Sequence, residues 1–194
     1  MLYEVEKPTL AGRNRARGAG AGGLAARVHV MISRMSTREF FAKRLASEVP
    51  AFLRVIRACP SDRLDYKPHE RSAGAGSLAT QLASEMAHLA ELFEKGEIHY
   101  AAGEPPSTCD EIAADFEHHA GQALERVKSL DEERWGGKAK FYMGDQVAWE
   151  TTVEGMAWGY LFDMVHHRGQ LSAYIRPMGG KVPSIYGPSG DDNT

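Results

Sequence analysis

The residues of this sequence with the clearest chemical potential are a carboxylate and an imidazole at helical spacing. Asp163 and His167 are four residues apart, so on a helix they lie one turn apart on the same side. An ionised carboxylate and a neutral imidazole placed in this way converge on one point and can bind one divalent cation. Hydrophobic residues of the same segment fall on that side too, which predicts that the pair faces the protein interior.

A second segment carries polar residues on one helical face. Gln81, Glu85 and His88 follow one another at intervals of four and three residues. Glu85 also borders the hydrophobic stripe of that helix, and Glu48 lies on the hydrophobic stripe of an earlier helix. An unpaired buried carboxylate costs several kcal/mol, whereas a shared divalent cation satisfies acidic groups from separate helices at once. The predicted metal ligands are Asp163, His167, Glu85, Gln81 and His88. The predicted proton acceptor is Glu85 or Glu48.

Each of these residues also has a purely structural interpretation. Asp163 and His167 can form an ordinary hydrogen-bonded pair within one helix at a half-exposed position. His88 can be a surface or core histidine with satisfied hydrogen bonds, and Gln81 a hydrogen-bonding residue instead of a ligand. Glu48 can pair with a neighbouring basic residue of its own helix. With these roles the core would hold a hydrogen-bonded network and no metal.

Two helices are predicted in the first half of the chain. The first begins with a capping box, in which Ser36 and Glu39 each satisfy a backbone N–H of the other, and Pro50 predicts a kink in it. The second is expected to begin at Ser77 and to end before Gly96, because glycine readily adopts the left-handed conformation that closes a helix.

Two more helices are predicted in the second half. The segment 97–107 contains consecutive prolines, which indicates a loop. Thr108 and Thr151 each stand three residues before a glutamate, and these two capping boxes are expected to open the third and fourth helices. Weak alternation over residues 138–149 predicts a short β-hairpin before the last helix. The predicted fold is all-α, a four-helix bundle around one core.

Composition is typical of one soluble globular domain. The chain has 194 residues, of which 43% are hydrophobic and 25% charged, and a formal charge of -3, so nothing draws it toward nucleic acid. Cys59 and Cys109 form no Cys-x-x-Cys pair, which excludes a thiolate zinc site and favours a reducing, cytoplasmic compartment. Neither lies on the predicted site faces. No window approaches the length of apolar sequence that spans a membrane.

The first 34 residues differ from the rest in composition. They hold six basic and two acidic residues and a run rich in Gly and Ala, which predicts a disordered leader before a bundle domain at 35–194. A secretory signal is disfavoured because glycines interrupt any apolar core, and a transit peptide because they weaken its amphipathic helix. A third interpretation, which we favour, is an unstructured extension translated from upstream of a true start at Met31 or Met35.

The segment 161–171, LFDMVHHRGQL, resembles the DinB (damage-inducible) superfamily of four-helix metalloproteins. The match continues through 174–189, and residues 60–79 look like that family's connection into the second helix. The resemblance covers about residues 36–190, and it implies an up-up-down-down bundle, commonly a homodimer. It also implies a nickel- or zinc-type site of three histidines, one from the second helix and two from a His-x-x-x-His pair in the fourth.

This sequence departs from that pattern at two of the three positions. Asp163 stands where the first histidine of the pair would be, Gln81 stands at the position of the second-helix histidine, and only His167 is retained. An oxygen-rich set with one imidazole suits Mn, Fe or Zn better than a site of three imidazoles does. Relatives in the family include thiol-dependent transferases and isomerases.

Two functions are therefore considered. The first is a metal-dependent transferase or hydrolase that acts on a small molecule; because neither cysteine lies on the site faces, a nucleophilic thiol would come from a low-molecular-weight cofactor. The second is a non-enzymatic stress- or damage-response protein, or a binding protein, whose altered site holds no metal.

Overall fold

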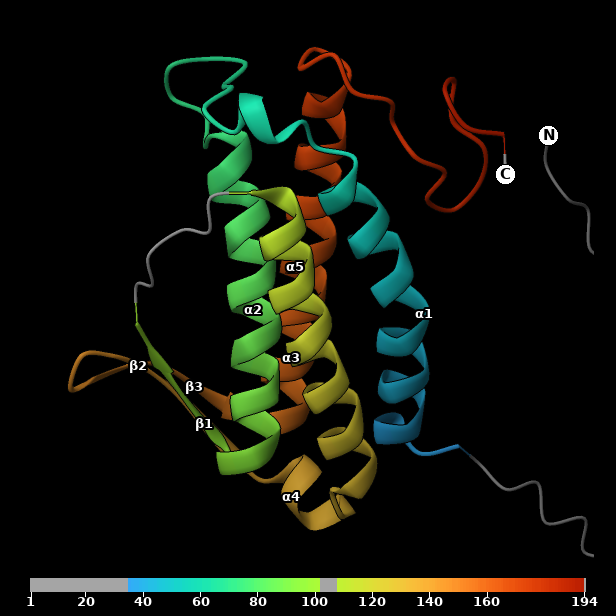
Figure 1. Ribbon diagram of the computed structural model, residues 1–194. Helices are drawn as coiled ribbons and strands as arrows, with labels where there is room; N and C mark the ends of the chain where they lie inside the picture. Colours follow the sequence, from blue (N-terminus) through green and yellow to red (C-terminus); the bar gives the residue numbers. More distant parts are fainter. Residues whose placement is uncertain (1–34, 102–107, 194) are drawn as a thin grey trace, which may run out of the picture. The chain divides into compact units, whose positions relative to one another are not determined.

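A computed structural model of the protein describes residues 35–101 and 108–193 (Figure 1). The predicted leader at 1–34 lies outside the described residues. Four long helices form the predicted bundle: α1 (Thr37–Arg57), α2 (Ala75–Lys95), α3 (Cys109–Ser129) and α5 (Val153–Ile175). Two short helices were not predicted, the 3-10 turn η1 (Ser61–Arg63) and α4 (Glu132–Gly136). The all-α bundle expected from the sequence is confirmed.

The helix starts follow the capping signals in two of four cases. The capping boxes of Ser36 and of Thr108 are both present. The expected box at Thr151 is wrong, because Thr152, the last residue of the preceding strand, caps α5 instead and its hydroxyl accepts a hydrogen bond from the backbone N–H of Gly155. The expected start of α2 at Ser77 is also wrong. The backbone N–H groups of the first two residues of α2 donate to carbonyl groups of the preceding loop, so the helix begins two residues earlier without a side-chain cap.

The helix ends agree better with the sequence. Gly96 has φ 77°, the left-handed conformation expected after α2, and the backbone N–H of Gly96 donates to Leu92 O. Pro50 lies inside α1, as predicted. Gly179, with φ 90°, lies in the turn that follows α5.

The chain also forms a three-stranded sheet, with one strand before α3 and two strands after it. The strands are β1 (Glu97–Tyr100), β2 (Lys138–Met143) and β3 (Gln146–Thr152), in the order β1-β2-β3. The predicted hairpin of β2 and β3 is confirmed, with Gly144 at φ 60° in its turn. The expected loop at 97–107 is wrong over its first four residues, because they pair in parallel with β2. Residues 102–107 of that loop lie outside the described residues.

The long helices run in two directions. In Figure 1, α1 runs upwards, α2 and α3 run downwards and α5 runs upwards, so the order along the chain is up-down-down-up and not the expected up-up-down-down. Contacts between side chains agree with this arrangement: Tyr160 of α5 meets His88 of α2, whereas His167, later in α5, meets Glu85, which is earlier in α2, so these two helices are antiparallel. The site residues of α2 and α5 therefore lie opposite each other.

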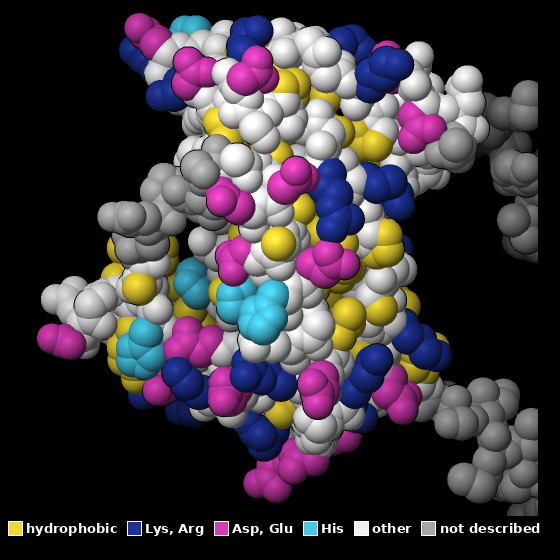
Figure 2. All heavy atoms as spheres, in the orientation of Figure 1, with side chains coloured by type: hydrophobic (Ala, Val, Ile, Leu, Met, Phe, Trp, Pro, Cys, Tyr) yellow, Lys and Arg dark blue, Asp and Glu magenta, His cyan; other side chains and the backbone are white. Residues whose placement is uncertain are grey.

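The core and the surface follow the amphipathic pattern of the helices. Aromatic side chains of three elements, Phe41, Phe93 and Trp135, contact one another in the core, and burying one such side chain contributes about 1.5–3 kcal/mol. On the face in Figure 2, basic and acidic side chains are interspersed. Within the described residues, no helix is long and apolar enough to cross a membrane.

Candidate metal centre

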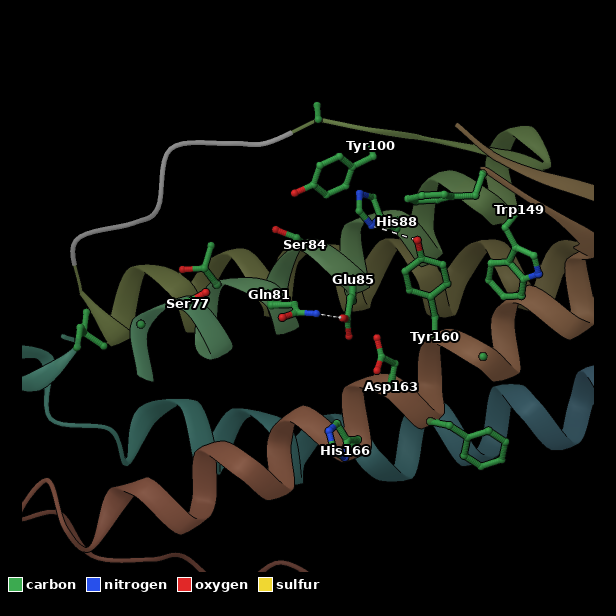
Figure 3. Close-up of a pocket in the computed structure, with 17 residues that line it drawn as sticks. Ser77, Gln81, Ser84, Glu85, His88, Tyr100, Trp149, Tyr160, Asp163 and His166 are labelled. Atoms are coloured by element: carbon green, nitrogen blue, oxygen red, sulfur yellow. Dashed lines mark hydrogen bonds between the residues drawn. The ribbon is translucent and has the colours of Figure 1, made fainter. Parts of the chain in front are cut away.

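A cavity of about 1220 Å³ lies between α2, α5 and the sheet. Figure 3 shows that hydroxyl and amide side chains of α2 line one part of it, and aromatic side chains of the strands and of α5 line another. The labelled residues of these two kinds are Ser77, Gln81, Ser84, Tyr100, Tyr160 and Trp149. Glu85 and Asp163 face each other between the two parts. The predicted polar face of α2 is therefore one wall of a cavity.

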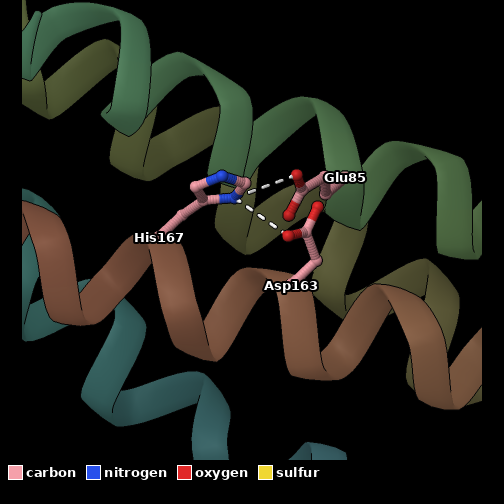
Figure 4. A group of neighbouring side chains, drawn as sticks. All are labelled: Glu85, Asp163 and His167. Atoms are coloured by element: carbon pink, nitrogen blue, oxygen red, sulfur yellow. Dashed lines mark ion pairs between the residues drawn. The ribbon is translucent and has the colours of Figure 1, made fainter. Parts of the chain in front are cut away.

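Glu85, Asp163 and His167 come together as the sequence predicts, with Glu85 and Asp163 on the lining of this cavity and His167 beside them. The expectation that the whole α5 pair faces the interior is wrong for Asp163, whose side chain is more than half exposed. One ligand atom of each residue lies within 4.8 Å of those of the other two (Figure 4). His167 Nδ1 is 3.2 Å from Glu85 Oε1 and 3.8 Å from Asp163 Oδ1. The side chains of Glu85 and His167 are 7% and 14% exposed, whereas that of Asp163 is 55% exposed. The group could hold a metal ion that remains accessible from the Asp163 side.

Two atoms of this group lack a hydrogen-bond partner. Glu85 Oε2 and His167 Nδ1 are buried, and neither takes part in a hydrogen bond within the described residues. His167 Nδ1 lies close to Glu85 Oε1, but the two atoms are not aligned for a hydrogen bond. A buried polar atom without a partner costs about 1–3 kcal/mol, and a cation bound to both atoms removes that cost. The residues present therefore fit a divalent cation.

The electrostatics of the group set the protonation of its members. Burial, and secondarily the nearby Asp163, raise the pKa of Glu85 to about 8, although the hydrogen bond from Gln81 acts in the opposite direction. Burial is the main cause that lowers the pKa of His167, with Asp163 opposing it and His166 adding to it. The imidazole is thus neutral at pH 7 and can bind a metal, whereas Glu85 must release a proton to do so.

The other two predicted ligands lie beside the group without joining it. Gln81 Nε2 donates a 2.8 Å hydrogen bond to Glu85 Oε1, so Gln81 orients the carboxylate. His88 lines the cavity, and its Nδ1 lies 3.4 Å from Tyr160 Oη. Burial lowers the pKa of the His88 imidazole. The hydrogen-bonding roles that the sequence allowed for both residues are the ones observed.

The structure does not bring Glu48 to this group. Its Oε2 accepts hydrogen bonds from Arg168 Nη1 at 2.6 Å and from Tyr186 Oη at 2.8 Å, and its Oε1 pairs with Arg44. Glu48 is buried as predicted, but its charge already has partners, so it is not available as the proton acceptor of the site. The sequence did not indicate Arg168 as the partner of Glu48. Arg168 directly follows His167, so its side chain leaves α5 on a different side from the candidate site.

The aromatic part of the cavity was also missed. Tyr100 comes from β1, a strand that the sequence did not predict, and Trp149 comes from β3 of the hairpin. Their arrival at α5 depends on the pairing of β1 with β2, a contact between residues far apart in the chain. The aromatic residues Phe141 and Trp149 within the predicted hairpin were the only sequence feature that could have indicated this part of the cavity.

Comparisons with known proteins identify the fold. No known family profile matches the chain, and no curated protein matches it. A DinB-like protein from Bacillus subtilis is similar in structure, with a TM-score of 0.56 and 16% identity over 72% of this chain and 92% of that one. A DinB-like protein from Bacillus cereus has a TM-score of 0.62 and 15% identity over 76% and 97%. The resemblance carried by residues 161–171 is therefore confirmed at the level of the fold: the chain has a helical-bundle fold similar to that of these two DinB-like proteins.

Proposed function

We propose that this DinB-like bundle holds a divalent cation between α2 and α5 and uses it in the chemistry of a small molecule. The proposal depends on one observation, the convergence of Glu85, Asp163 and His167 with two buried atoms that lack hydrogen bonds. Two carboxylates and one imidazole favour Zn, Mn or Fe over Ni.

The chemistry that suits this site is a transferase or hydrolase reaction. A divalent cation, when bound, lowers the pKa of a water or thiol that it contacts. Gln81 holds Glu85 in place, and the neutral imidazole of His167 turns its Nδ1 toward both carboxylates. In the metal-free group the pKa of Glu85 is about 8, so its carboxyl group gives up a proton when a cation binds, and Glu85 is the proposed group that takes up or releases a proton at the site.

A nucleophilic thiol, if the reaction uses one, comes from a small molecule. Cys59 and Cys109 are buried, and neither lines the cavity. A low-molecular-weight thiol as cofactor therefore remains part of the proposal. Both cysteines are free, which supports a reducing compartment, the cytoplasm.

The metal content of the purified protein tests the proposed cation. We expect close to one equivalent of Zn, Mn or Fe in protein purified without a histidine tag, and loss of that metal in the double variant Asp163→Ala/His167→Ala. His166→Ala is the matched control, because His166 is adjacent in sequence and outside the ligand group. Metal retained by the double variant, or lost equally by His166→Ala, would contradict the assignment of the ligands.

A second function is favoured by a different observation. Glu85 accepts a hydrogen bond from Gln81, and its raised pKa lets it stay neutral beside Asp163, so the group is chemically stable without metal. A non-enzymatic binding protein or stress- and damage-response protein fits this state. Less than about a tenth of a metal equivalent per chain, unchanged by the double substitution, would favour this function over the first.

The homodimer implied by the resemblance is also proposed. Phe40 and Phe162 are exposed and join Trp158 in a run of aromatic contacts on α1 and α5, which a second copy of the chain would cover. Light scattering should give twice the mass of the chain, and a double substitution of Phe40 and Phe162 by serine should give the mass of one chain. A monomeric unmodified protein would contradict the proposal.

A further inference from the structure

We infer that the cavity beside Glu85 and Asp163 selects small molecules that have a flat apolar body, a polar end and no negative charge. The inference deepens the proposed function, since it takes this cavity as the substrate site. It concerns the class of ligand and not the cation, so the two can be tested separately.

The charges that line the cavity are the first support. Its only acidic lining residues are Glu85 and Asp163, and no Lys or Arg is among the lining residues that the structure describes. A bound divalent cation would have its charge offset by the two carboxylates. An anionic ligand would therefore gain no net attraction from the cavity and would lose its hydration on entering it. Neutral or cationic ligands avoid that cost.

The aromatic part of the cavity is the second support. The ring of His88 lies 5.7 Å from that of Tyr160, 6.1 Å from that of Tyr100 and 6.3 Å from that of Phe141. These spacings are typical of interacting aromatic rings, and such a cluster presents faces and edges to a flat ligand. Tyr100 and Trp149 are also partly exposed, so this part of the cavity is open to solvent.

The contact between Trp149 and α5 depends on a glycine. A Cβ atom added to Gly159 would lie 2.9 Å from the Trp149 ring, which is closer than nonbonded carbon atoms approach. Glycine at this position lets the indole pack against the helix beside Tyr160 where it does, and any larger residue would make the ring shift. The glycine thus positions one aromatic wall of the cavity, and a substitution here changes that wall without touching the acidic residues.

The polar part of the cavity is the third support. Ser77, Thr80 and Ser84 share one face of α2 and all line the cavity. Thr80 Oγ1 is buried and has no hydrogen-bond partner within the described residues, and the same holds for Glu85 Oε2. The hydroxyl groups of this face and the side-chain amide of Gln81 can each donate or accept hydrogen bonds with an uncharged or cationic polar end of a ligand. The volume of about 1220 Å³ is at or above the usual range for small-molecule sites, so a ligand of this kind fits.

Three probes with the same ring and different polar ends test the inference: phenethylamine, phenethyl alcohol and phenylacetate. We would measure their binding by calorimetry to the full chain in chelator at a pH near 8, where imidazoles are uncharged. The amine and the alcohol are expected to bind at least about tenfold more tightly than phenylacetate. Phenylacetate binding as tightly as the alcohol, or no binding of any probe at millimolar concentration, would overturn the inference.

Two variants and a control locate the binding. Gly159→Ala should weaken binding of the amine and the alcohol alike, because it displaces Trp149, whereas Val147→Ala on the same strand lies outside the lining residues and should leave both unchanged. Asp163→Asn should weaken the amine alone. If Gly159→Ala does not fold, Trp149→Leu takes its place. Probe binding that is unchanged in both Gly159→Ala and Trp149→Leu would overturn the assignment of the cavity. If the protein as purified carries no metal and the probes still bind in the expected pattern in chelator, only the proposed cation is contradicted.

Discussion

Arg168 Nη1 donates a 2.6 Å hydrogen bond to Glu48 Oε2 in the buried contact between α1 and α5. The Arg168 guanidinium also lies over the Phe52 ring, 4.6 Å from its centroid. The positive charge of Arg168 therefore interacts with both the Glu48 carboxylate and the face of an aromatic ring. Arg168 directly follows His167 in α5. The pair therefore fixes the rotation of the helix that carries two of the three candidate ligands, from the side opposite the cavity.

Replacing Arg168 should destabilise the protein strongly. Arg168→Met removes the one fully buried cationic partner of Glu48 and leaves the half-exposed Arg44 and the hydroxyl of Tyr186. Breaking a buried pair typically costs about 3–5 kcal/mol of unfolding free energy, and because two partners remain we expect a loss near the lower end of that range. Urea denaturation should show this loss, and the double variant Glu48→Met/Arg168→Met should recover part of it, because no charge is then buried.

An exposed ion pair provides the control for that experiment. Arg57 and Glu117 are 2.8 Å apart with both side chains about half exposed, so Arg57→Met should cost less than about 1 kcal/mol. Equal losses for Arg57→Met and Arg168→Met would show that burial of the Glu48 pair contributes nothing specific.

The stability of the metal-free protein should fall as the pH rises through the range in which Glu85 titrates. The pKa of Glu85 is about 8 in the folded chain, above the value of 4.5 for an unperturbed glutamate, so the folded state binds the proton more tightly than the unfolded state. Its contribution is therefore most favourable at a pH below 4.5, declines between 4.5 and about 8, and is constant above that. The decline is on the order of a few kcal/mol.

Glu85→Gln isolates this effect from other titrating groups. The difference in unfolding free energy between the unmodified protein and Glu85→Gln, measured in chelator at several pH values, should move against the unmodified protein as pH increases. A difference that stays flat from about pH 5 to pH 8 would mean that Glu85 is not held in its neutral form.

The bundle could be predicted from the sequence because its signals are local. The capping boxes of Ser36 and Thr108 and the left-handed Gly96 each depend on residues within one turn of the helix end. The cap of α5 falls on Thr152 and not on Thr151 because β3 continues through Thr152, and the pairing of that strand with β2 is not visible in the local capping pattern. β1 was missed for the same reason, since four residues carry too little pattern to indicate a strand without their pairing partner.

The candidate site was predictable where helical spacing placed its members and not where tertiary contacts did. Asp163 with His167 follows from one helix, and Glu85 from the polar face of another. Glu48 shared the same signals, a carboxylate on a hydrophobic stripe, but its partners are Arg168 and a tyrosine of the C-terminal segment. Spacing within one helix does not identify which neighbour a buried charge meets.

Replacing His167 should reduce thermal stability mainly when metal is present. A ligand that binds only the folded state raises the melting temperature, so removing a ligating residue removes that gain. We expect His167→Ala to lower the melting temperature clearly in the presence of Zn or Mn and little in chelator. An equal loss under both conditions would mean that the imidazole stabilises the fold by packing and not by binding a cation.

Replacing Gln81 should weaken metal binding without changing the ligands. Gln81 Nε2 donates to Glu85 Oε1, and this hydrogen bond lowers the pKa of Glu85 and fixes its carboxylate. Gln81→Leu should therefore reduce metal affinity about 10–100-fold at neutral pH, as loss of a residue that orients a ligand typically does. Ser84→Ala is the control, since Ser84 lines the same cavity and is not among the ligand group.

Because the lost hydrogen bond acts through the protonation of Glu85, the loss of metal affinity in Gln81→Leu should shrink as the pH is raised above about 8. A deficit that is independent of pH would show that Gln81 only positions the carboxylate, and no deficit at all would separate Gln81 from the site.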